Sequence, residues 1–299
     1  MGDLKLFRIK DGVTELKGTS VAMEKSLQVF IEANMEVFFG IRFLASEYST
    51  GKNHGGRIDS LGIDENFCPV IIEYKRALNE NVINQGLYYL DWLMDHKADF
   101  KLLVMEKLGK ESADKIEWSM PRLLCIAGDF TKYDEYAVKQ INRNIELIRY
   151  KKYEDDLILF DLVNVTTESQ VPNSMSVEDT KTKTVSQNIQ QADEELQDRY
   201  YAIRDFIINL GEDVQEKALK YYIAFKKIRN FACIEVYPTG KTILMYLKLN
   251  PDDVELEEGF IRDVRKIGHL GTGDLEVRIE SDRDFDKAKP LIIKSYDKN

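Results

Sequence analysis

Two carboxylates and a lysine that together could hydrolyse a phosphodiester stand close in the sequence. They are Asp59, Glu73 and Lys75, and the last two end a strand-like run that begins Pro69-Val70-Ile71-Ile72. Two carboxylates can fix a divalent cation, which polarises a phosphoryl oxygen and lowers the pKa of a water molecule. A lysine amine can orient or deprotonate that water and stabilise the growing negative charge. These residue types predict metal-dependent phosphodiester hydrolysis.

Two β-strands have to position these three side chains. The polar segment Asp64-Glu65-Asn66-Phe67 separates two apolar stretches, as a hairpin turn does. Because alternate side chains of a strand share a face, Glu73 and Lys75 point the same way, roughly 6.5 to 7 Å apart, and Tyr74 points the other way. A register that sets Asp59 beside Glu73 would bring both carboxylates and the amine to one face.

The segments on either side of this hairpin support a built site. Gly55 and Gly56 directly precede the Asp59 strand and allow close approach of another backbone or side chain. The segment Asn79 to Met94 has apolar residues at helical spacing. On that helix Gln85 and Tyr89 are four residues apart and therefore share a face.

The remaining pattern before residue 167 alternates between strands and helices. Helices are expected over Met23–Asn34, Ala98–Leu108 and Tyr133–Asn142, and further strands over Ile41–Tyr48, Pro121–Ala127, Ile145–Tyr150 and Leu157–Val163. This order predicts an α/β domain, a mixed sheet flanked by helices.

Residues Thr167 to Gln191 contain no aromatic residue and no apolar period, which predicts a linker. The predicted organisation is a domain over 1–166, a linker over 167–191 and a smaller α+β domain over 192–299. In the second domain we expect helices over Glu194–Leu210, Gly259–Arg265 and Asp284–Tyr296, and strands over Lys220–Phe225, Phe231–Val236, Thr242–Leu249 and Leu275–Ile279.

Composition limits the cofactor and the compartment. The three cysteines and three histidines show no spacing of a zinc site, so a metal held by carboxylates would be Mg²⁺ or Mn²⁺. No run of about 18 apolar residues and no signal peptide is visible, so we expect a cytoplasmic protein without a membrane segment. The net charge of −10 argues against coating of nucleic acid through overall charge. Locally, Lys52, Arg57, Lys75 and Arg76 supply positive charge and are candidate contacts to nucleic acid.

The motif Arg57-Ile58-Asp59, then Glu73-Tyr74-Lys75, then Gln85 and Tyr89, resembles the PD-(D/E)xK nuclease superfamily, in particular its NucS-like and RecB-like branches. The resemblance covers roughly residues 20 to 165 and implies the restriction-endonuclease-like fold. It implies that Asp59 and Glu73 are metal ligands and Lys75 the catalytic lysine. It also implies that Gln85 and Tyr89 orient the site or contact the DNA backbone.

Those branches also carry a glutamate on the first helix. Glu24 is the best match for this further metal ligand, and Glu32 and Glu36 are weaker candidates. Where the usual motif has Pro-Asp, this chain has Ile58-Asp59.

The second domain, from about Arg199, resembles a domain of unknown function that is often fused to such nuclease cores. The stretches that carry this resemblance are Tyr222-Ile223-Ala224-Phe225-Lys226, Asn230-Phe231 and Ile267-Gly268-His269-Leu270-Gly271-Thr272-Gly273-Asp274. The glycines there fit a tight turn better than a phosphate cradle, and His269 fits a packing role better than a catalytic one. The aromatic residues Tyr221, Tyr222, Phe225 and Phe231 stand among basic residues and either pack in a core or stack on nucleic acid.

These observations predict a metal-dependent endonuclease that acts on DNA, with the second domain selecting or positioning the substrate. The alternative is a nuclease-like module that has lost catalysis and binds nucleic acid or a protein. A homodimer is possible, since two sites related by symmetry cut both strands of a duplex most easily. A small-molecule enzyme using Gly271-Thr272-Gly273 has no strand-loop-helix phosphate motif to support it.

Overall fold

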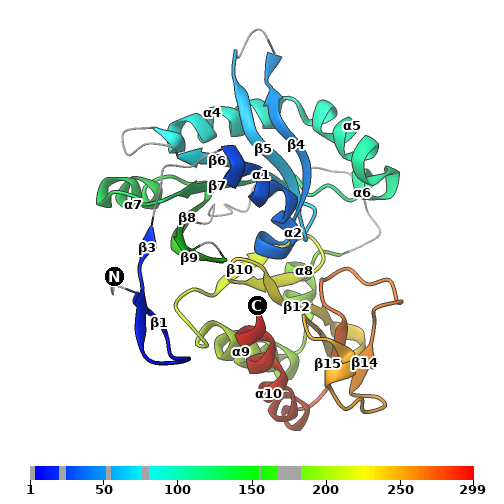
Figure 1. Cartoon of the computed structure of the whole chain (residues 1–299). Helices are drawn as coiled ribbons and strands as arrows, with labels where there is room; N and C mark the ends of the chain where they lie inside the picture. The colour runs from blue at the N-terminus through cyan, green and yellow to red at the C-terminus, as the bar shows by residue number, and fades with distance from the viewer. Residues whose placement is uncertain (1–3, 20–24, 52–54, 76–80, 155, 167–182) are drawn as a thin grey trace. The chain divides into compact units, whose positions relative to one another are not determined.

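The structure is a computed structural model that describes residues 4–19, 25–51, 55–75, 81–154, 156–166 and 183–299. The chain divides into two units, Met1–Pro172 and Asn173–Asn299. Figure 1 traces both units from the N-terminus to the C-terminus.

The first unit is built on a seven-stranded mixed sheet. Its order is β3-β8-β7-β6-β5-β4, and β9 pairs with β8. The strands are β3 (Gly18–Thr19), β4 (Ile41–Ser49), β5 (Arg57–Asp64), β6 (Pro69–Lys75), β7 (Arg122–Ala127), β8 (Asn144–Tyr153) and β9 (Leu157–Thr166). The β4-β5-β6 part is antiparallel, whereas β6, β7 and β8 run parallel. The predicted mixed α/β sheet is confirmed.

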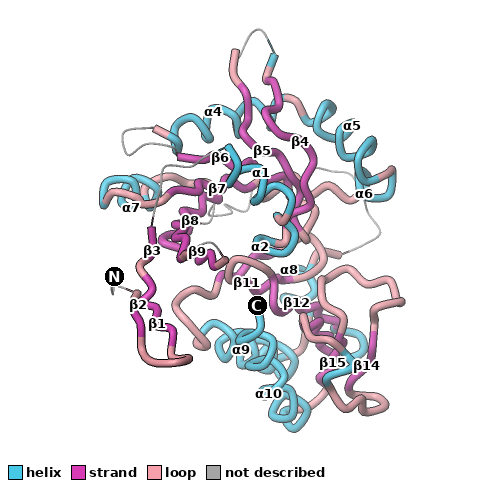
Figure 2. The backbone as a smooth tube through the Cα atoms, in the orientation of Figure 1, coloured by secondary structure: helices cyan, strands magenta, loops and turns pink. Residues whose placement is uncertain are grey.

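Helices lie against this sheet, as Figure 2 shows in cyan. They are α1 (Lys25–Ala33), α2 (Met35–Phe39), α4 (Val82–Asp95), α5 (Lys97–Leu108), α6 (Lys110–Asp114) and α7 (Lys132–Lys139). Helix α4 follows β6 and precedes its parallel neighbour β7, so it is part of the crossover that parallel strands require. It packs closely, because a Cβ at Gly86 would lie 2.4 Å from a methyl carbon of Leu123.

Several details of the first unit differ from the sequence prediction, which also lacked the short elements β3 and α6. The expected helix over Met23–Asn34 is followed by a second short helix, α2, which ends where Gly40 takes a φ of 65°. A separate hairpin of β1 (Leu6–Arg8) and β2 (Thr14–Leu16) was not predicted. Its strands have three residues each, too few for a clear alternation of apolar side chains to appear in the sequence.

The second unit holds a six-stranded antiparallel sheet of order β10-β11-β12-β13-β15-β14. Its elements are α8 (Val185–Gln191), α9 (Glu194–Ile208), β10 (Gln215–Ala218), β11 (Ile223–Lys226), β12 (Asn230–Tyr237), η1 (Pro238–Gly240), β13 (Thr242–Leu247), η2 (Pro251–Asp253), β14 (Ile261–Asp263), β15 (Leu275–Ile279) and α10 (Asp282–Lys298). One face of the sheet forms a core with the helices, through residues such as Ile203, Ile234, Met245, Val277 and Ile292. This is the smaller α+β domain expected from the sequence.

The predicted linker over 167–191 is too long at its C-terminal end. Residues Val185–Gln191 form α8, which begins with a capping box between Thr184 and Gln187. Val185 and Ile189 are buried in the core of the second unit. A seven-residue helix shows fewer than two periods of its apolar pattern, so its polar composition masked it. Residues 167–182 lie outside the described residues.

The prediction of a helix over Gly259–Arg265 is also wrong. Residues Ile261–Asp263 form strand β14, which pairs antiparallel with β15. Backbone pairing with β15, the next strand along the chain, decides the conformation of this short segment. Strand β10 was likewise missed. Within the described residues, none of the helices is both long and apolar enough to cross a membrane.

Candidate functional site

Asp59 and Glu73 face each other at the point where the ladder between β5 and β6 ends. The last backbone pair is Ser60 with Ile72, so Asp59 and Glu73 occupy the next pair of positions. At these positions the side-chain carboxylates, in place of backbone carbonyls, accept hydrogen bonds from amides of the opposite strand. The amide N–H of Asp59 donates to Oε1 of Glu73 at 3.1 Å, and the amide N–H of Tyr74 donates to Oδ2 of Asp59 at 3.0 Å. The predicted register, with Asp59 beside Glu73, agrees with these contacts.

Both carboxylates lie on the face of the sheet that α4 covers. Leu61, two residues after Asp59, and Ile71, two residues before Glu73, belong to the core that includes α4. Glu73 is 1% exposed and pairs with Cys125 of β7. A buried carboxylate beside a second carboxylate is unfavourable as an anion, and a nearby cation relieves this.

Tyr89 of α4 reaches the same strand two residues before Asp59. Its hydroxyl accepts a hydrogen bond from the amide N–H of Arg57 at 3.2 Å and one from Nε2 of Gln85 at 3.3 Å. The ring lies against Gly56, where an added Cβ would be 2.6 Å from the Tyr89 ring. The predicted helix face of Gln85 and Tyr89 is therefore turned toward the Asp59 strand, and Gly56 makes the close approach possible.

A second polar network lies on the opposite face at the same level. The Tyr74 hydroxyl is 3.2 Å from the Ser60 hydroxyl, which donates to Oε1 of Glu32 at 2.6 Å. Gln28 of α1 donates to Oε1 of Glu32 and to the carbonyl of Asp59, at 3.0 and 3.3 Å. Burial raises the pKa of Tyr74, and the carboxylates of Glu32, Asp59 and Glu73 raise it further.

Gln28 was missed by the sequence analysis. It is fully buried and lies three residues before Ile31 on the inner side of α1. A polar residue on the apolar side of a helix was the signal that could have identified it.

Of the three candidates for a third carboxylate from the first helix, the structure describes two, and neither lies with Asp59 and Glu73. Glu24 lies outside the described residues. Glu32 is engaged with Ser60, and Glu36 lies in the first turn of α2. Among the residues that the structure describes, no three His, Cys, Asp or Glu side chains are grouped as metal ligands.

The chemistry of the remaining pair still fits a hard divalent cation. Mg²⁺ takes oxygen ligands, keeps several waters and is commonly held by one or two carboxylates together with substrate phosphates. Asp59 and Glu73 supply two carboxylates from adjacent strands, held in place by backbone amides. These are the residues that would hold the ion.

The basic candidates are only partly described. Lys75 is the last residue of β6 and pairs in register with Ala127, while its side chain lies outside the described part of the chain. Lys52 and Arg76 also lie outside it. Arg57 is exposed, with its Nε 3.7 Å from a carboxylate oxygen of Glu47.

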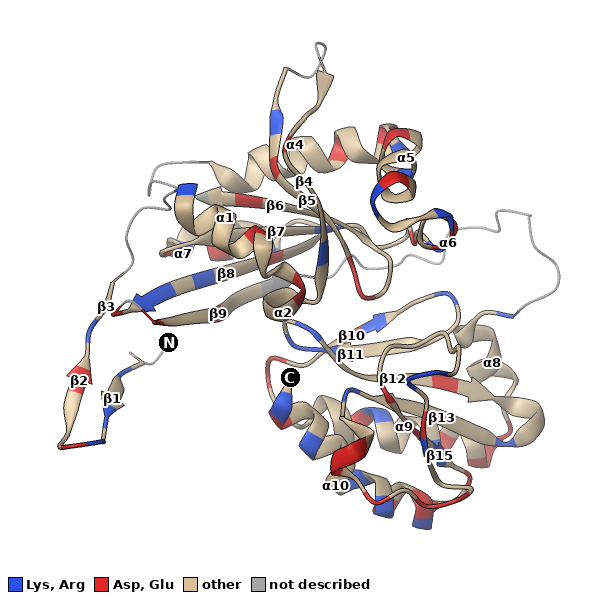
Figure 3. Cartoon of the chain, turned by 45° about the vertical axis from the view of Figure 1, so that its right-hand side comes forward, with Lys and Arg blue, Asp and Glu red and all other residues tan. Residues whose placement is uncertain are grey.

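The fold adds basic residues that the sequence analysis did not select. Ala127 pairs with Arg149 of the parallel strand β8, so Arg149 stands two strands from Lys75 at the same level. Lys151 follows two residues later and shares its face. Figure 3 shows this basic end of β8 in blue. Arg149 is held by Asp161 through a 2.5 Å contact.

The glycine-rich segment of the second unit is a packed turn. A Cβ at Gly273, whose φ is +135°, would lie 2.8 Å from the backbone of Leu247. A Cβ at Gly271 would lie 2.7 Å from that of Cys233. The His269 ring stacks on Tyr246 with centroids 4.5 Å apart. These contacts agree with a turn and a packing histidine.

Three of the four aromatic rings considered for stacking on nucleic acid are buried. They are Tyr222, Phe225 and Phe231, and the last two have no exposed surface. Rings in a core cannot stack on a base, so these three residues pack the second unit.

Comparisons with known proteins give one relative of nearly full length. An uncharacterized protein of Haemophilus influenzae is 30% identical over 303 residues, covering 97% of this chain and 98% of that protein. This chain belongs to the same family as that protein. Membership brings no activity with it, because the relative is itself uncharacterized.

A family model described as "Domain of unknown function (DUF5655)" matches residues 185–299. The match begins at the first residue of α8, which places this helix with the second domain.

Among solved structures, one chain of "Structure of EndoMS-dsDNA2 complex" is 18% identical. The match covers 48% of this chain and 59% of that chain, with a TM-score of 0.26. A structural similarity this weak supports no conclusion about the fold or the function of this chain.

Proposed function

We propose that the chain is a metal-dependent nuclease that hydrolyses phosphodiester bonds in DNA. The observation that carries the proposal is the opposed pair Asp59 and Glu73 at the open end of the β5–β6 ladder. Lys75 follows Glu73 by two residues on the same strand. Two carboxylates and a lysine in this order are the set that the resemblance to PD-(D/E)xK nucleases assigns to catalysis.

Each residue has a separate task in this proposal. Asp59 and Glu73 hold a Mg²⁺ or Mn²⁺ ion, which when bound supplies positive charge against the charge that develops on the phosphoryl group. Lys75 orients the attacking water, takes up its proton and stabilises the transition state. Tyr89 and Gln85 fix the Arg57 backbone and thereby the entry to the Asp59 strand.

Positive charge beside the pair favours a polyanionic substrate despite the net charge of −10. Arg57 lies at the start of β5, and Arg149 and Lys151 lie toward the C-terminal end of β8. Backbone phosphates bind such side chains without sequence preference. We assign these residues, with Lys52 and Arg76, to the phosphate backbone.

The test is cleavage of labelled single-stranded, double-stranded and branched DNA by the full chain, with Mg²⁺, with Mn²⁺ and with chelator. Wild type is compared with Glu73→Gln and with Asp95→Asn, which changes an exposed carboxylate at the end of α4. We expect metal-dependent products from wild type and Asp95→Asn and none from Glu73→Gln.

A second outcome would favour the non-catalytic reading. If no substrate is cut and no divalent ion raises the melting temperature, the chain is a binding module with a nuclease-like site. If Glu73→Gln cuts as well as wild type, the activity belongs to another site or to a contaminant. Light scattering of the same sample, with and without duplex, tests whether a homodimer forms.

A further inference from the structure

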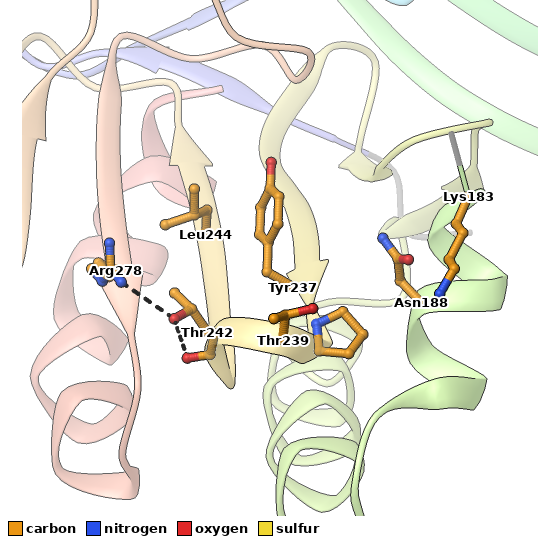
Figure 4. A pocket seen from close by; sticks show the side chains of 9 residues that line it. Lys183, Asn188, Tyr237, Thr239, Thr242, Leu244 and Arg278 are labelled. Atoms are coloured by element: carbon orange, nitrogen blue, oxygen red, sulfur yellow. Dashed lines mark hydrogen bonds between the residues drawn. The ribbon is translucent and has the colours of Figure 1, made fainter. Parts of the chain in front are cut away.

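The second unit carries a pocket of about 630 Å³ that the proposed nuclease site does not use. Figure 4 shows it from close by. Six of its lining residues matter here: Lys183, Asn188, Tyr237, Thr242, Leu244 and Arg278. The volume falls within the range of small-molecule sites, roughly 300 to 1,000 Å³.

The pocket lies over the face of the sheet that is turned away from the core. Val236, Ile243 and Ile279 are core residues and pair across β12, β13 and β15. Side chains one position along each strand point to the other face. Tyr237 paired with Thr242, and Leu244 paired with Arg278, line the pocket on that face.

Tyr237 gives the pocket a fixed aromatic wall. The residue is 43% exposed, and its hydroxyl donates to Oε2 of Glu235, which is buried. Burial and the neighbouring Glu235 raise the pKa of Tyr237, so the hydroxyl stays protonated and keeps this anchor. Leu244 adds apolar surface beside the ring, as Figure 4 shows.

Two cations line the pocket on opposite sides of this ring in Figure 4. Arg278 is held by Glu280, with Nε at 2.6 Å from its carboxylate, and lies 3.4 Å from the Thr242 hydroxyl. Glu280 neutralises part of the charge of Arg278 but also fixes the guanidinium, which has five N–H donors. Lys183 donates to the amide oxygen of Gln191, a neutral partner.

An aromatic wall with apolar surface beside it and a cation on either side is suited to a base that carries phosphate. Stacking on an aromatic side chain accepts any base, because every base has a π-face. Phosphate oxygens take charge-assisted hydrogen bonds from arginine and lysine. An inorganic anion would leave Tyr237 and Leu244 unused, and an apolar ligand would leave both cations unused.

We propose that this pocket binds one nucleotide unit, with its base against Tyr237 and its phosphate on Arg278 or Lys183. The unit comes either from a free nucleotide or from a single strand that crosses the pocket. The proposal does not depend on the nuclease activity, since binding is measured with chelator and without cleavage.

The test uses the full chain and two probes, adenosine monophosphate followed by calorimetry and a fluorescent eight-residue oligothymidylate followed by anisotropy. Inorganic phosphate serves as the comparison ligand. We expect Tyr237→Leu and Arg278→Ala each to weaken binding of the nucleotide probe by about tenfold, the value for the loss of one stacked base or one charged contact.

Two matched variants in the same unit serve as controls. Tyr201→Leu removes a half-exposed tyrosine of α9, and Arg283→Ala removes an exposed arginine of α10. Both should bind as wild type does. Circular dichroism confirms the fold of each variant. If Tyr237→Leu fails to fold, the affinities of Arg278→Ala and Arg278→Gln for the nucleotide probes test the proposal instead.

The outcomes separate the sources and the alternatives. Binding of the monophosphate indicates a free nucleotide, and binding of the oligonucleotide alone indicates a strand. Photo-crosslinking of an iodouracil oligonucleotide should then label the peptide that contains Tyr237. Equal affinity of all variants, labelling of the first unit alone, or no binding of either probe would overturn the proposal.

Discussion

In the first unit, two pairs of carboxylates are held by different kinds of contact. On one face of the sheet, Arg122 bridges Asp64 and Glu146 through three contacts of 2.8, 2.8 and 2.9 Å. On the other face, Asp59 and Glu73 are positioned by backbone amides. All of these residues except Asp59 are almost fully buried.

The difference indicates that a buried carboxylate with a purely structural role needs a cationic partner within the fold. Burial lowers the pKa of Arg122, but Glu146 and Asp64 outweigh it and raise the pKa above its ordinary value. That triad carries its own guanidinium. Asp59 and Glu73 instead stand opposite each other across two strands and accept hydrogen bonds from the backbone amides of Tyr74 and Asp59. We interpret the first set as a structural element and the second as the candidate site.

The largest expected effect is on the structural set. Arg122→Met leaves two buried carboxylates without their counter-ion and should lower the free energy of unfolding by about 3 to 5 kcal/mol. Urea denaturation followed by circular dichroism measures it. Lys139→Met, at an exposed position of α7, should change the value by less than about 0.5 kcal/mol. If both variants lower the free energy of unfolding by the same small amount, Arg122 is not the structural counter-ion that the comparison assumes.

Next in size is the effect of Glu73→Gln on catalysis. The amide keeps the shape of the side chain but removes the charge that holds the ion, so kcat/KM should fall at least about 100-fold, equivalent to about 2.7 kcal/mol. Steady-state cleavage of a labelled DNA measures it. Unfolding in urea should shift far less than in Arg122→Met, and a parallel loss of stability would make Glu73 a structural residue instead.

A metal titration sharpens the comparison within a single strand. Mn²⁺ at about 100 times its Kd should stabilise wild type by about 2.7 kcal/mol, seen as a higher melting temperature. Asp59→Asn should lose this response.

Asp64→Asn is the matched change five residues later on β5. It removes one of the two carboxylates that pair with Arg122 and should melt below wild type with or without Mn²⁺. If Asp64→Asn loses the Mn²⁺ response and Asp59→Asn keeps it, the carboxylates around Arg122 form the metal site and the Asp59–Glu73 pair is structural.

The smallest effect is expected from Tyr89→Phe. The change removes the acceptor for the Arg57 amide and the partner of Gln85, which should lower the free energy of unfolding by about 0.5 to 1.5 kcal/mol. We expect a loss of less than about tenfold in kcat/KM, because the ring still packs on Gly56. Denaturation and cleavage of the same preparation measure both, and an activity loss as large as that of Glu73→Gln would give the hydroxyl a direct role.

Much of the candidate site could be predicted because it depends on local spacing. The apolar run before Glu73 predicted β6, and the period of two predicts a shared face for Glu73 and Lys75. The period of the segment after residue 79 predicted α4 and the shared face of Gln85 and Tyr89.

Contacts between distant segments could not be predicted in this way. Asp59 and Asp64 lie on the same strand with similar local sequence, yet one faces Glu73 and the other Arg122. The bonds from Gln28 and Glu32 of α1 to β5 span 31 and 28 residues.

The sequence alone therefore predicted most of the longer strands and helices and the residue types at the site, because periodicity and turn chemistry act over a few residues. Only the tertiary structure decided which carboxylate meets an arginine and which meets another carboxylate. It also decided that residues 261–263 form a strand and that Tyr237 lines a pocket. Burial and strand pairing depend on neighbours further along the chain than the few residues over which periodicity and turn chemistry act.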